Sequence, residues 1–251
     1  MSRARYDDIG REYATTRRED PVLRDRIHEA LGDAGRIVNV GAGTGSYEPR
    51  DRFVMPVEPS AVMVAQRRPG SAPAVRAWAA ALPLRDRSVD AAMAVLTLHH
   101  WDDALRAGLR ELRRVARGPV VVVTYDARVS GEMWLVKDYL PELGALDRSI
   151  FPSIKDLADS LGGTVEVQAV PTSRDTPDWT LGSFWAHPER VLDETARNAT
   201  SGLARMAPGV IDRLVGELRR DLDDGTWERR NGHLRELPEL DVGMRLIVAT
   251  P

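Results

Sequence analysis

The sequence predicts an α/β fold built on a doubly wound, mostly parallel sheet. Between residues 36 and 125, apolar runs of strand length alternate with segments of helical periodicity, and this order is typical of parallel sheets with right-handed crossovers. A glycine-rich turn follows the first apolar run, and a single acid ends the second. Ligands of such sheets bind outside the carboxyl ends of the strands. We therefore expect the functional site at that edge of the sheet.

Composition excludes several classes of function. The chain has 251 residues, a formal net charge of −3 and no cysteine. A slightly negative protein has no overall field that attracts nucleic acid or an anionic membrane. Disulfides, thiolate nucleophiles and cysteine zinc sites are excluded, and three of the five histidines, at positions 28, 187 and 233, lack the spacing of metal ligands. The polar N-terminus and the lack of a long apolar run predict a cytoplasmic protein without a membrane anchor.

The absence of a long linker or an internal repeat predicts one domain over residues 1–251. We divide it into an N-terminal arm or lid (1–35), a core (36–125) and a substrate-side half (126–251) with a helical insertion at about 171–240. Tyr6, Tyr13 and Arg17 in the arm either pack structurally or close over a ligand.

The first half of the chain has clear signals for each element. Residues 22–31 have a helical period, with Asp20 as the expected N-cap and Pro21 near the helix start. The strand at 37–40 leads into a glycine turn, after which only a short helix fits before the strand at 53–57. A helix start there would offer free N–H groups to an anion. Pro56 lacks an N–H donor, which indicates an edge or irregular position for its strand.

The later elements follow from periodicity and from glycine and proline positions. A helix is expected after Ser60, which caps it. The other predicted strands cover residues 74–79, 89–98, 120–125, 164–170 and 242–249, and the other predicted helices cover 102–115, 133–140, 154–161, 188–206 and 208–222.

The glycine turn narrows the kind of ligand. A dinucleotide fingerprint needs a third glycine where Ser46 stands, and no phosphate-binding G-x-x-x-x-G-K-[ST] segment occurs. Glycines allow positive φ and close contact between a ligand and the backbone. Glu58, at the end of the next strand, offers a carboxylate for a ribose diol. The pattern thus favours a nucleoside without a pyrophosphate.

Four segments together resemble class I S-adenosylmethionine-dependent methyltransferases. Residues 38–45 (VNVGAGTG) resemble motif I, and 57–60 (VEPS) resemble the acidic motif II. Residues 79–84 (AAALPL) are similar to the A-E-x-L-P-F segment. Residues 96–101 (LTLHHW) are similar to the end of strand four in the small-molecule, ubiquinone/menaquinone-type branch. The match covers roughly residues 36–125.

The resemblance implies a cofactor site for S-adenosylmethionine, with S-adenosylhomocysteine as the product. The implied cofactor-binding residues are Gly41, Gly43 and Gly45 against the methionine part, Glu58, Pro59 and Ser60 at the ribose, Trp78 and Ala79 beside the adenine, Leu96 and Thr97 near the sulfonium, and Tyr6 and Tyr13 from the arm. Three positions depart from the family pattern: Asn39 stands where an acid usually opens motif I, Trp78 where an Asp is common, and Ala80 where a Glu is usual.

Methyl transfer from a sulfonium needs alignment of the acceptor and, for a hydroxyl or acidic C–H acceptor, a general base. His100 and His99 are the catalytic candidates, since histidine titrates near neutral pH, although either could instead cap a helix or bond a carbonyl group. Trp179 and Trp185 are candidates for an apolar substrate pocket, with core packing as the alternative.

We therefore predict methyl transfer to a small-molecule acceptor, such as a specialised metabolite, with no nucleic acid or membrane partner. One alternative is an RNA methyltransferase, which the net charge disfavours. Another is a non-catalytic, cofactor-binding regulatory protein, which the three departures motivate. The sequence does not indicate the acceptor or the methylated atom.

Overall fold

The computed structural model describes residues 17–251, and within them a six-stranded sheet runs in the order β2-β1-β3-β4-β8-β5. Its strands are β1 (Arg36–Val40), β2 (Phe53–Val57), β3 (Ala91–Val95), β4 (Val120–Tyr125), β5 (Thr164–Ala169) and β8 (Met244–Thr250). The first four strands pair in parallel, whereas β8 is antiparallel to β4 and β5. The mostly parallel α/β fold is confirmed.

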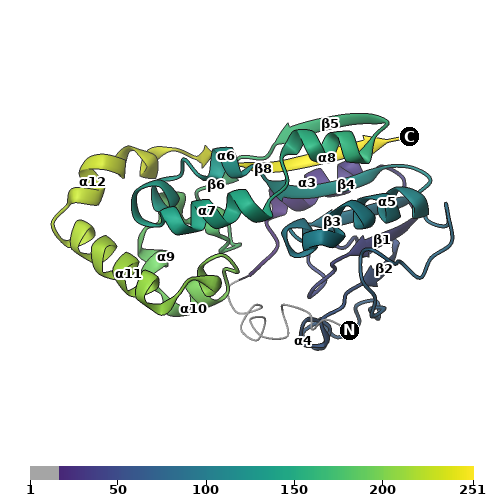
Figure 1. The fold of residues 1–251 in the computed structure, drawn as a ribbon, viewed down its shortest axis with the longest axis horizontal. Coiled ribbons are helices and arrows are strands. Elements are labelled where there is room, and N and C mark those ends of the chain that lie inside the picture. Colours follow the sequence, from purple (N-terminus) through teal and green to yellow (C-terminus); the bar gives the residue numbers. More distant parts are fainter. Residues whose placement is uncertain (1–16) are drawn as a thin grey trace.

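Helices cover both faces of this sheet (Figure 1). Helix α3 (Pro21–Ala30) packs against one face, and α5 (Leu105–Val115) and α8 (Ile154–Leu161) pack against the other. Because alternate strand residues point to opposite faces, Ile37 belongs to the α3 side and Val38 to the α5 side. The central strands β1, β3 and β4 are therefore buried on both sides, as their apolar runs predict.

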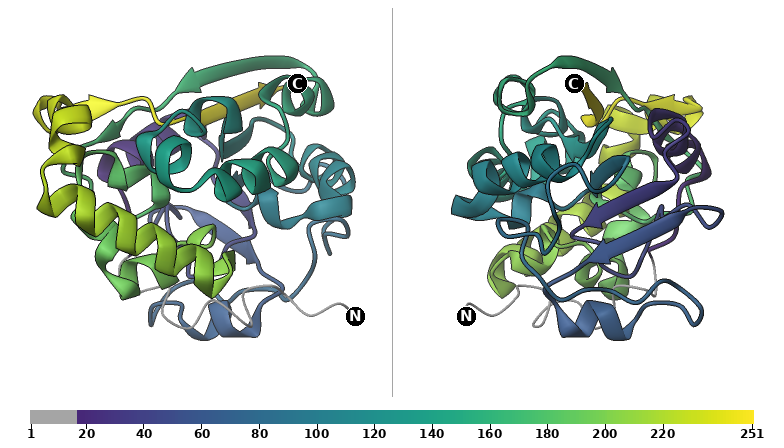
Figure 2. Two further views of the ribbon diagram at one scale, coloured as in Figure 1. Left: turned by 60° about the vertical axis from the view of Figure 1, so that its left-hand side comes forward. Right: turned by 90° about the vertical axis from the view of Figure 1, so that its right-hand side faces the viewer.

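The helices that follow β4, apart from α8, form a block at one side of the sheet (Figures 1 and 2). They are α6 (Ala127–Ser130), the π-helix η3 (Leu135–Tyr139), α7 (Pro141–Ile150), η4 (Leu181–Ala186), α9 (Glu189–Leu192), α10 (Glu194–Asn198), η5 (Leu203–Arg205), α11 (Pro208–Asp223), α12 (Thr226–Asn231) and η6 (Gly232–Glu236). A small ribbon of β6 (Thr172–Ser173) and β7 (Glu239–Leu240) adjoins them. The block has its own apolar core around Trp134, Phe184, Trp185 and Trp227. None of the described helices is both long and apolar enough to cross a membrane.

Local signals set the helix starts as expected. The Asp20 carboxylate accepts hydrogen bonds from the backbone N–H groups of Val22 and Leu23, so it caps α3. Ser60 Oγ accepts one from Met63 N and caps α4 (Ala61–Ala65). Strand β2, which contains Pro56, is an edge strand of the sheet, and among residues 17–251 a single bridge, between Val57 and Val75, extends the sheet beyond it.

Several predicted elements differ from the structure. The helix predicted over 188–206 is wrong: Asp193 has extended backbone and caps a new helix through Ala196 N, so α9, α10 and η5 form instead. The strand predicted at 74–79 reduces to the bridge at Val75. The strand predicted at 89–98 ends at Val95, since Leu96 has a φ of +51°. No helix forms between the glycine turn and β2. Helix α7 has no counterpart among the predicted helices.

Candidate active site

The glycine turn after β1 folds back tightly onto its neighbours. Gly41, Gly43 and Gly45 have φ values of +72°, +51° and +90°, which side chains on Cβ disfavour. Gly41 N donates to Val57 O at 2.9 Å, and a Cβ at position 41 would lie 2.1 Å from Thr97 Oγ1. The turn therefore requires glycine for its conformation and, at position 41, also for space.

Glu58 stands at the end of β2, and its side chain is only 6% exposed. Its Oε2 accepts a hydrogen bond from Gly43 N at 2.8 Å, and its Oε1 accepts one from Ser60 N at 2.8 Å. Each carboxylate oxygen has two lone pairs and can accept more than one hydrogen bond. The backbone thus fixes a carboxylate that is able to accept a diol.

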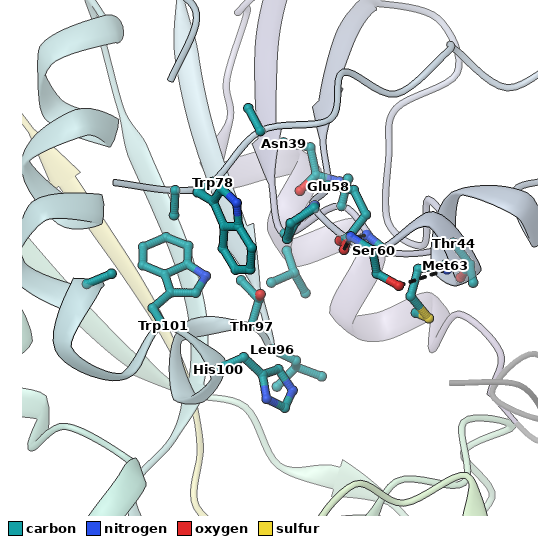
Figure 3. A pocket seen from close by; sticks show the side chains of 18 of the residues that line it. Asn39, Thr44, Glu58, Ser60, Met63, Trp78, Leu96, Thr97, His100 and Trp101 are labelled. Carbon is teal, nitrogen blue, oxygen red and sulfur yellow. Dashed lines mark hydrogen bonds between the residues drawn. The ribbon is translucent and has the colours of Figure 1, made fainter. Parts of the chain in front are cut away.

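A cavity of about 340 Å³ opens in front of this turn (Figure 3). Figure 3 shows Trp78 and Trp101 on one side of it and Glu58, Ser60 and Met63 on the other. Trp78 is 42% exposed, whereas Trp101 is buried against Gly108, where a Cβ would lie 2.6 Å from Trp101 Cε3. This volume lies in the range of small-molecule and cofactor sites. We call it the cofactor cavity.

The departure at Asn39 has a structural reason. Asn39 lines the cofactor cavity, and its Nδ2 donates to Glu48 Oε1 at 3.0 Å. Glu48 in turn forms a buried ion pair with Arg67, at 2.6 Å between Glu48 Oε2 and the nearer guanidinium nitrogen. An acid at position 39 would place two carboxylates in contact, and such pairs resist joint ionisation. The amide is the side chain that fits beside Glu48.

A second cavity, of about 80 Å³, adjoins the first; Arg17 and Leu96 line both. It lies between the sheet edge and the helical block. Its other walls come from His99, Tyr125, Ser130, Met133, Asp147, Ile150, Phe151, Thr180, Leu181, Gly182, Thr200, Ser201, Gly202, Arg205 and Val242. Leu96, between the two cavities, holds a positive φ, and residues in such rare conformations cluster at functional sites. We call this the acceptor cavity.

The acceptor cavity combines apolar and polar groups. The His99 and Phe151 rings lie 4.6 Å apart between centroids, and Phe151 meets Tyr125 edge-on at 6.2 Å. Burial raises the pKa of Tyr125 to about 12, so its hydroxyl stays protonated at neutral pH. Burial also raises the pKa of Asp147 to about 7, against the opposing charges of Arg205 and Arg148.

Arg17 connects the two sides of the site. Its Nε lies 2.6 Å from Asp178 Oδ1, and the Tyr47 hydroxyl donates to Asp178 Oδ2 at 3.3 Å. Tyr47 directly follows the glycine turn, whereas Asp178 precedes η4 of the helical block. The pair thus joins the turn, the start of the described chain and the helical block beside both cavities.

The structure brings most of the sequence-predicted residues together. Most of the predicted cofactor-binding residues, together with His100, line the cofactor cavity: Gly41, Gly43, Glu58, Pro59, Ser60, Trp78, Ala79, Leu96, Thr97 and His100. Gly45 does not line it but lies against the side chain of Arg67. His99 faces the acceptor cavity. Tyr6 and Tyr13 lie outside the described residues. Residues 17–251 contain no cluster of potential metal ligands.

The two predicted substrate-side tryptophans lie outside both cavities. Trp185 is completely buried in the core of the helical block, and its Nε1 donates to Thr172 O at 3.2 Å. Trp179 lies under the Arg190 guanidinium, 4.8 Å from the ring centroid. In this structure both pack within the helical block, which corresponds to the core alternative.

The sequence does not single out several other cavity residues as candidates. The cofactor cavity also contains Met63, Trp101, Asp102 and Asp103, and the acceptor cavity contains Asp147. Asp102 and Asp103 read as helix-capping residues after the histidine pair, and only their place at a strand end hinted at a site. Asp147 lies in α7, which has no recognisable motif.

Comparison with known proteins agrees with this geometry. The model of a methyltransferase domain family matches residues 38–122. A crystal structure from Anabaena variabilis, named as a candidate methyltransferase from an antibiotic biosynthesis pathway, is 30% identical, with a TM-score of 0.87 over 94% of this chain and 99% of that one. The chain belongs to the class I S-adenosylmethionine-dependent methyltransferases. No curated protein matches this methyltransferase in sequence.

More distant structures share the fold of this methyltransferase. An S-adenosylmethionine-dependent methyltransferase from Thermotoga maritima, named as a possible histamine N-methyltransferase, has 19% identity and a TM-score of 0.58, over 98% of this chain and 97% of that one. A phosphoethanolamine N-methyltransferase from Haemonchus contortus, solved with S-adenosylhomocysteine, has 15% identity and a TM-score of 0.52, over 91% and 52% of the two chains.

The cofactor of this methyltransferase is S-adenosylmethionine, and the residues present fit it. The carboxylate of Glu58, held by two backbone amides, suits a ribose diol, and the glycine turn exposes backbone beside it. Trp78 and Trp101 supply aromatic surface for a purine. When bound, the cofactor supplies a methyl group that is already activated by its sulfonium.

Proposed function

We propose that this methyltransferase transfers the methyl group to a small-molecule acceptor, such as a specialised metabolite, bound in the acceptor cavity. The observation that carries the proposal is the second, small cavity that shares Leu96 and Arg17 with the cofactor cavity. Its largely apolar walls suit a compact molecule, and the net charge of −3 does not favour a nucleic acid. The name of the Anabaena relative, with its antibiotic biosynthesis pathway, supports a specialised metabolite.

The roles of the residues follow from their positions. Glu58 binds the ribose, the backbone around Gly41 and Gly43 contacts the methionine part, and Trp78 with Ala79 borders the adenine. The histidine pair, at 3.8 Å between ring centroids, places His100 at the cofactor cavity and His99 at the acceptor cavity. The 96–101 segment supports a place in the ubiquinone/menaquinone-type branch.

We further propose that residues 1–251 form one domain. The ion pair of Arg17 with Asp178 supports this, because it ties the start of the described chain to the helical block beside both cavities.

The test is methyl transfer from isotopically labelled cofactor into a cell extract separated into small-metabolite, RNA and protein fractions. We expect label in a small metabolite, identified by mass spectrometry, and none with the Glu58→Ala variant at low cofactor concentration. Label confined to RNA or protein, or no transfer despite cofactor binding, would refute the proposal.

A further inference from the structure

The acceptor cavity contains a buried carboxylate that the proposed function does not yet use. Asp147, on α7, is only 6% exposed and lines this cavity. In the part of the chain that the structure describes, its side chain makes no hydrogen bond and no salt bridge. Buried carboxylates that accept no hydrogen bond are costly, so they are rare outside functional sites.

A second polar group faces the same space. Ser130 Oγ lines the acceptor cavity, is buried, and has no hydrogen-bond partner among residues 17–251. Two buried polar side chains with unused hydrogen-bonding capacity in one cavity indicate a ligand with a polar group there. The aromatic walls from His99, Tyr125 and Phe151 indicate that the rest of this ligand is flat and apolar.

The charges around the cavity limit the polar group further. Arg17 is paired with Asp178, whereas the positive charges of Arg205 and Arg148 both act on the ionised form of Asp147. Positive charge is therefore already present near this carboxylate, and an ammonium group would add more of it. A neutral hydroxyl adds none, and Arg205 favours negative charge on its oxygen as the proton leaves.

We propose that Asp147 accepts the proton of a hydroxyl group on the methyl acceptor, and that the acceptor is a small compound with that hydroxyl on an aromatic frame. The inference rests on the proposed function. The acceptor O–H bond breaks as its proton moves to a carboxylate oxygen of Asp147. The electron pair of the acceptor oxygen forms the bond to the methyl carbon, and the pair of the broken C–S bond stays on sulfur. Asp147 then releases the proton to solvent.

The groups around Asp147 agree with this role. Burial raises the pKa of Asp147, and with the opposing effect of Arg205 and Arg148 it lies at about 7, which is close to the best value for a base at neutral pH. Arg17 lines the same cavity but is paired with Asp178, and the raised pKa of Tyr125 keeps its phenol protonated. His99 is the other titratable group that faces the cavity.

The test compares wild type, Asp147→Asn and the control Asp138→Asn, which changes an exposed acid on η3. Each is incubated with labelled cofactor and three probes of similar size: 4-ethylphenol, 4-ethylaniline and 4-ethylbenzylamine. We expect the phenol to be methylated on oxygen, Asp147→Asn to lower that rate about 100-fold or more, and Asp138→Asn to match wild type. Cofactor affinity, measured by calorimetry, should be the same in all three.

The pH profile separates a base from a structural residue. In wild type, kcat/KM should rise with pH through an apparent pKa near 7, and this acid limb should vanish in Asp147→Asn. An acid limb that persists in Asp147→Asn and disappears in His99→Ala would overturn the inference.

The acceptor itself gives a second criterion. Preferred methylation of either amine probe overturns the inference. If no probe reacts, the metabolite identified from the cell extract decides: a methylated hydroxyl supports the inference, and a methylated nitrogen or carbon overturns it. An extract without a labelled metabolite refutes the proposed function instead.

Discussion

The cofactor cavity and the acceptor cavity are built in different ways. Between residues 39 and 104, backbone turns and strand ends supply nearly all of the cofactor cavity, and backbone amides hold its carboxylate. Apart from Arg17, the acceptor cavity takes its walls from segments spread between residues 96 and 242, and its polar groups are side chains. We therefore expect backbone geometry to determine how the cofactor binds, and side chains that can change without altering the fold to determine which acceptor binds.

The largest expected effect comes from the glycine turn. In Gly41→Ala the new Cβ would meet Thr97 while the backbone keeps a φ of +72°, so the free energy of unfolding should fall by about 2–5 kcal/mol. Cofactor binding should be lost as well. Urea denaturation and calorimetry measure the two effects.

The control for the turn is Gly216→Ala in α11, where a Cβ meets open space. Alanine favours a helix, so this variant should gain about 0.5–1 kcal/mol of stability and bind the cofactor normally. Wild-type stability and affinity in Gly41→Ala would show that backbone geometry does not define the cofactor cavity.

In the acceptor cavity, the buried carboxylate of Asp147 should lower the stability of the folded protein as the pH rises. Because the folded pKa of Asp147, about 7, lies above its ordinary value of 3.8, the folded state binds this proton more tightly. The associated stability is present below the ordinary pKa and is lost as the pH rises to 7. Asp147→Asn should therefore be more stable than wild type at pH 8 by about 2–4 kcal/mol, with a smaller gain at pH 5.

Urea unfolding at both pH values measures this difference, with Asp138→Asn as the reference. An equal effect of Asp147→Asn at pH 5 and pH 8 would mean that the Asp147 carboxylate carries no such penalty.

An intermediate effect is expected at the cofactor carboxylate. Glu58→Ala should weaken the binding of S-adenosylmethionine by about 1–3 kcal/mol, the scale of lost hydrogen bonds to a charged group. Calorimetry measures it, and the exposed Glu166→Ala on β5 is the control. An unchanged affinity in Glu58→Ala would remove this residue from the ribose site.

The difference between the two cavities also explains which parts of the molecule can be predicted from the sequence. Strand β1, the glycine turn and Glu58 lie within about twenty residues, so local patterns identify the fold and most of the cofactor cavity. The sequence alone shows Asn39 as a departure from the family pattern, because its partner Glu48 belongs to no motif. The hydrogen bond between them forms only in the folded chain.

The acceptor cavity could not be predicted, because its parts meet only through tertiary packing. Asp147 lies in a helix without a motif, Thr180 directly precedes η4, and Arg205 ends η5. Trp179 and Trp185 were candidates because of their residue type, but both pack in the apolar core of the helical block. Their large surfaces stabilise a core as well as a pocket, and periodicity cannot separate these roles.

The smallest effects should distinguish two neighbours in the sequence. His100 lines the cofactor cavity, and His99 lines the acceptor cavity. His100→Ala should weaken cofactor binding by about 1 kcal/mol. His99→Ala should raise the KM of the acceptor by the factor that corresponds to the same free energy, and it should leave cofactor affinity unchanged. Calorimetry and steady-state kinetics give the two readouts. If both variants change cofactor affinity and acceptor KM equally, the two cavities act as one site. Cofactor binding by the backbone and acceptor binding by side chains would then not be separate at residues 99 and 100.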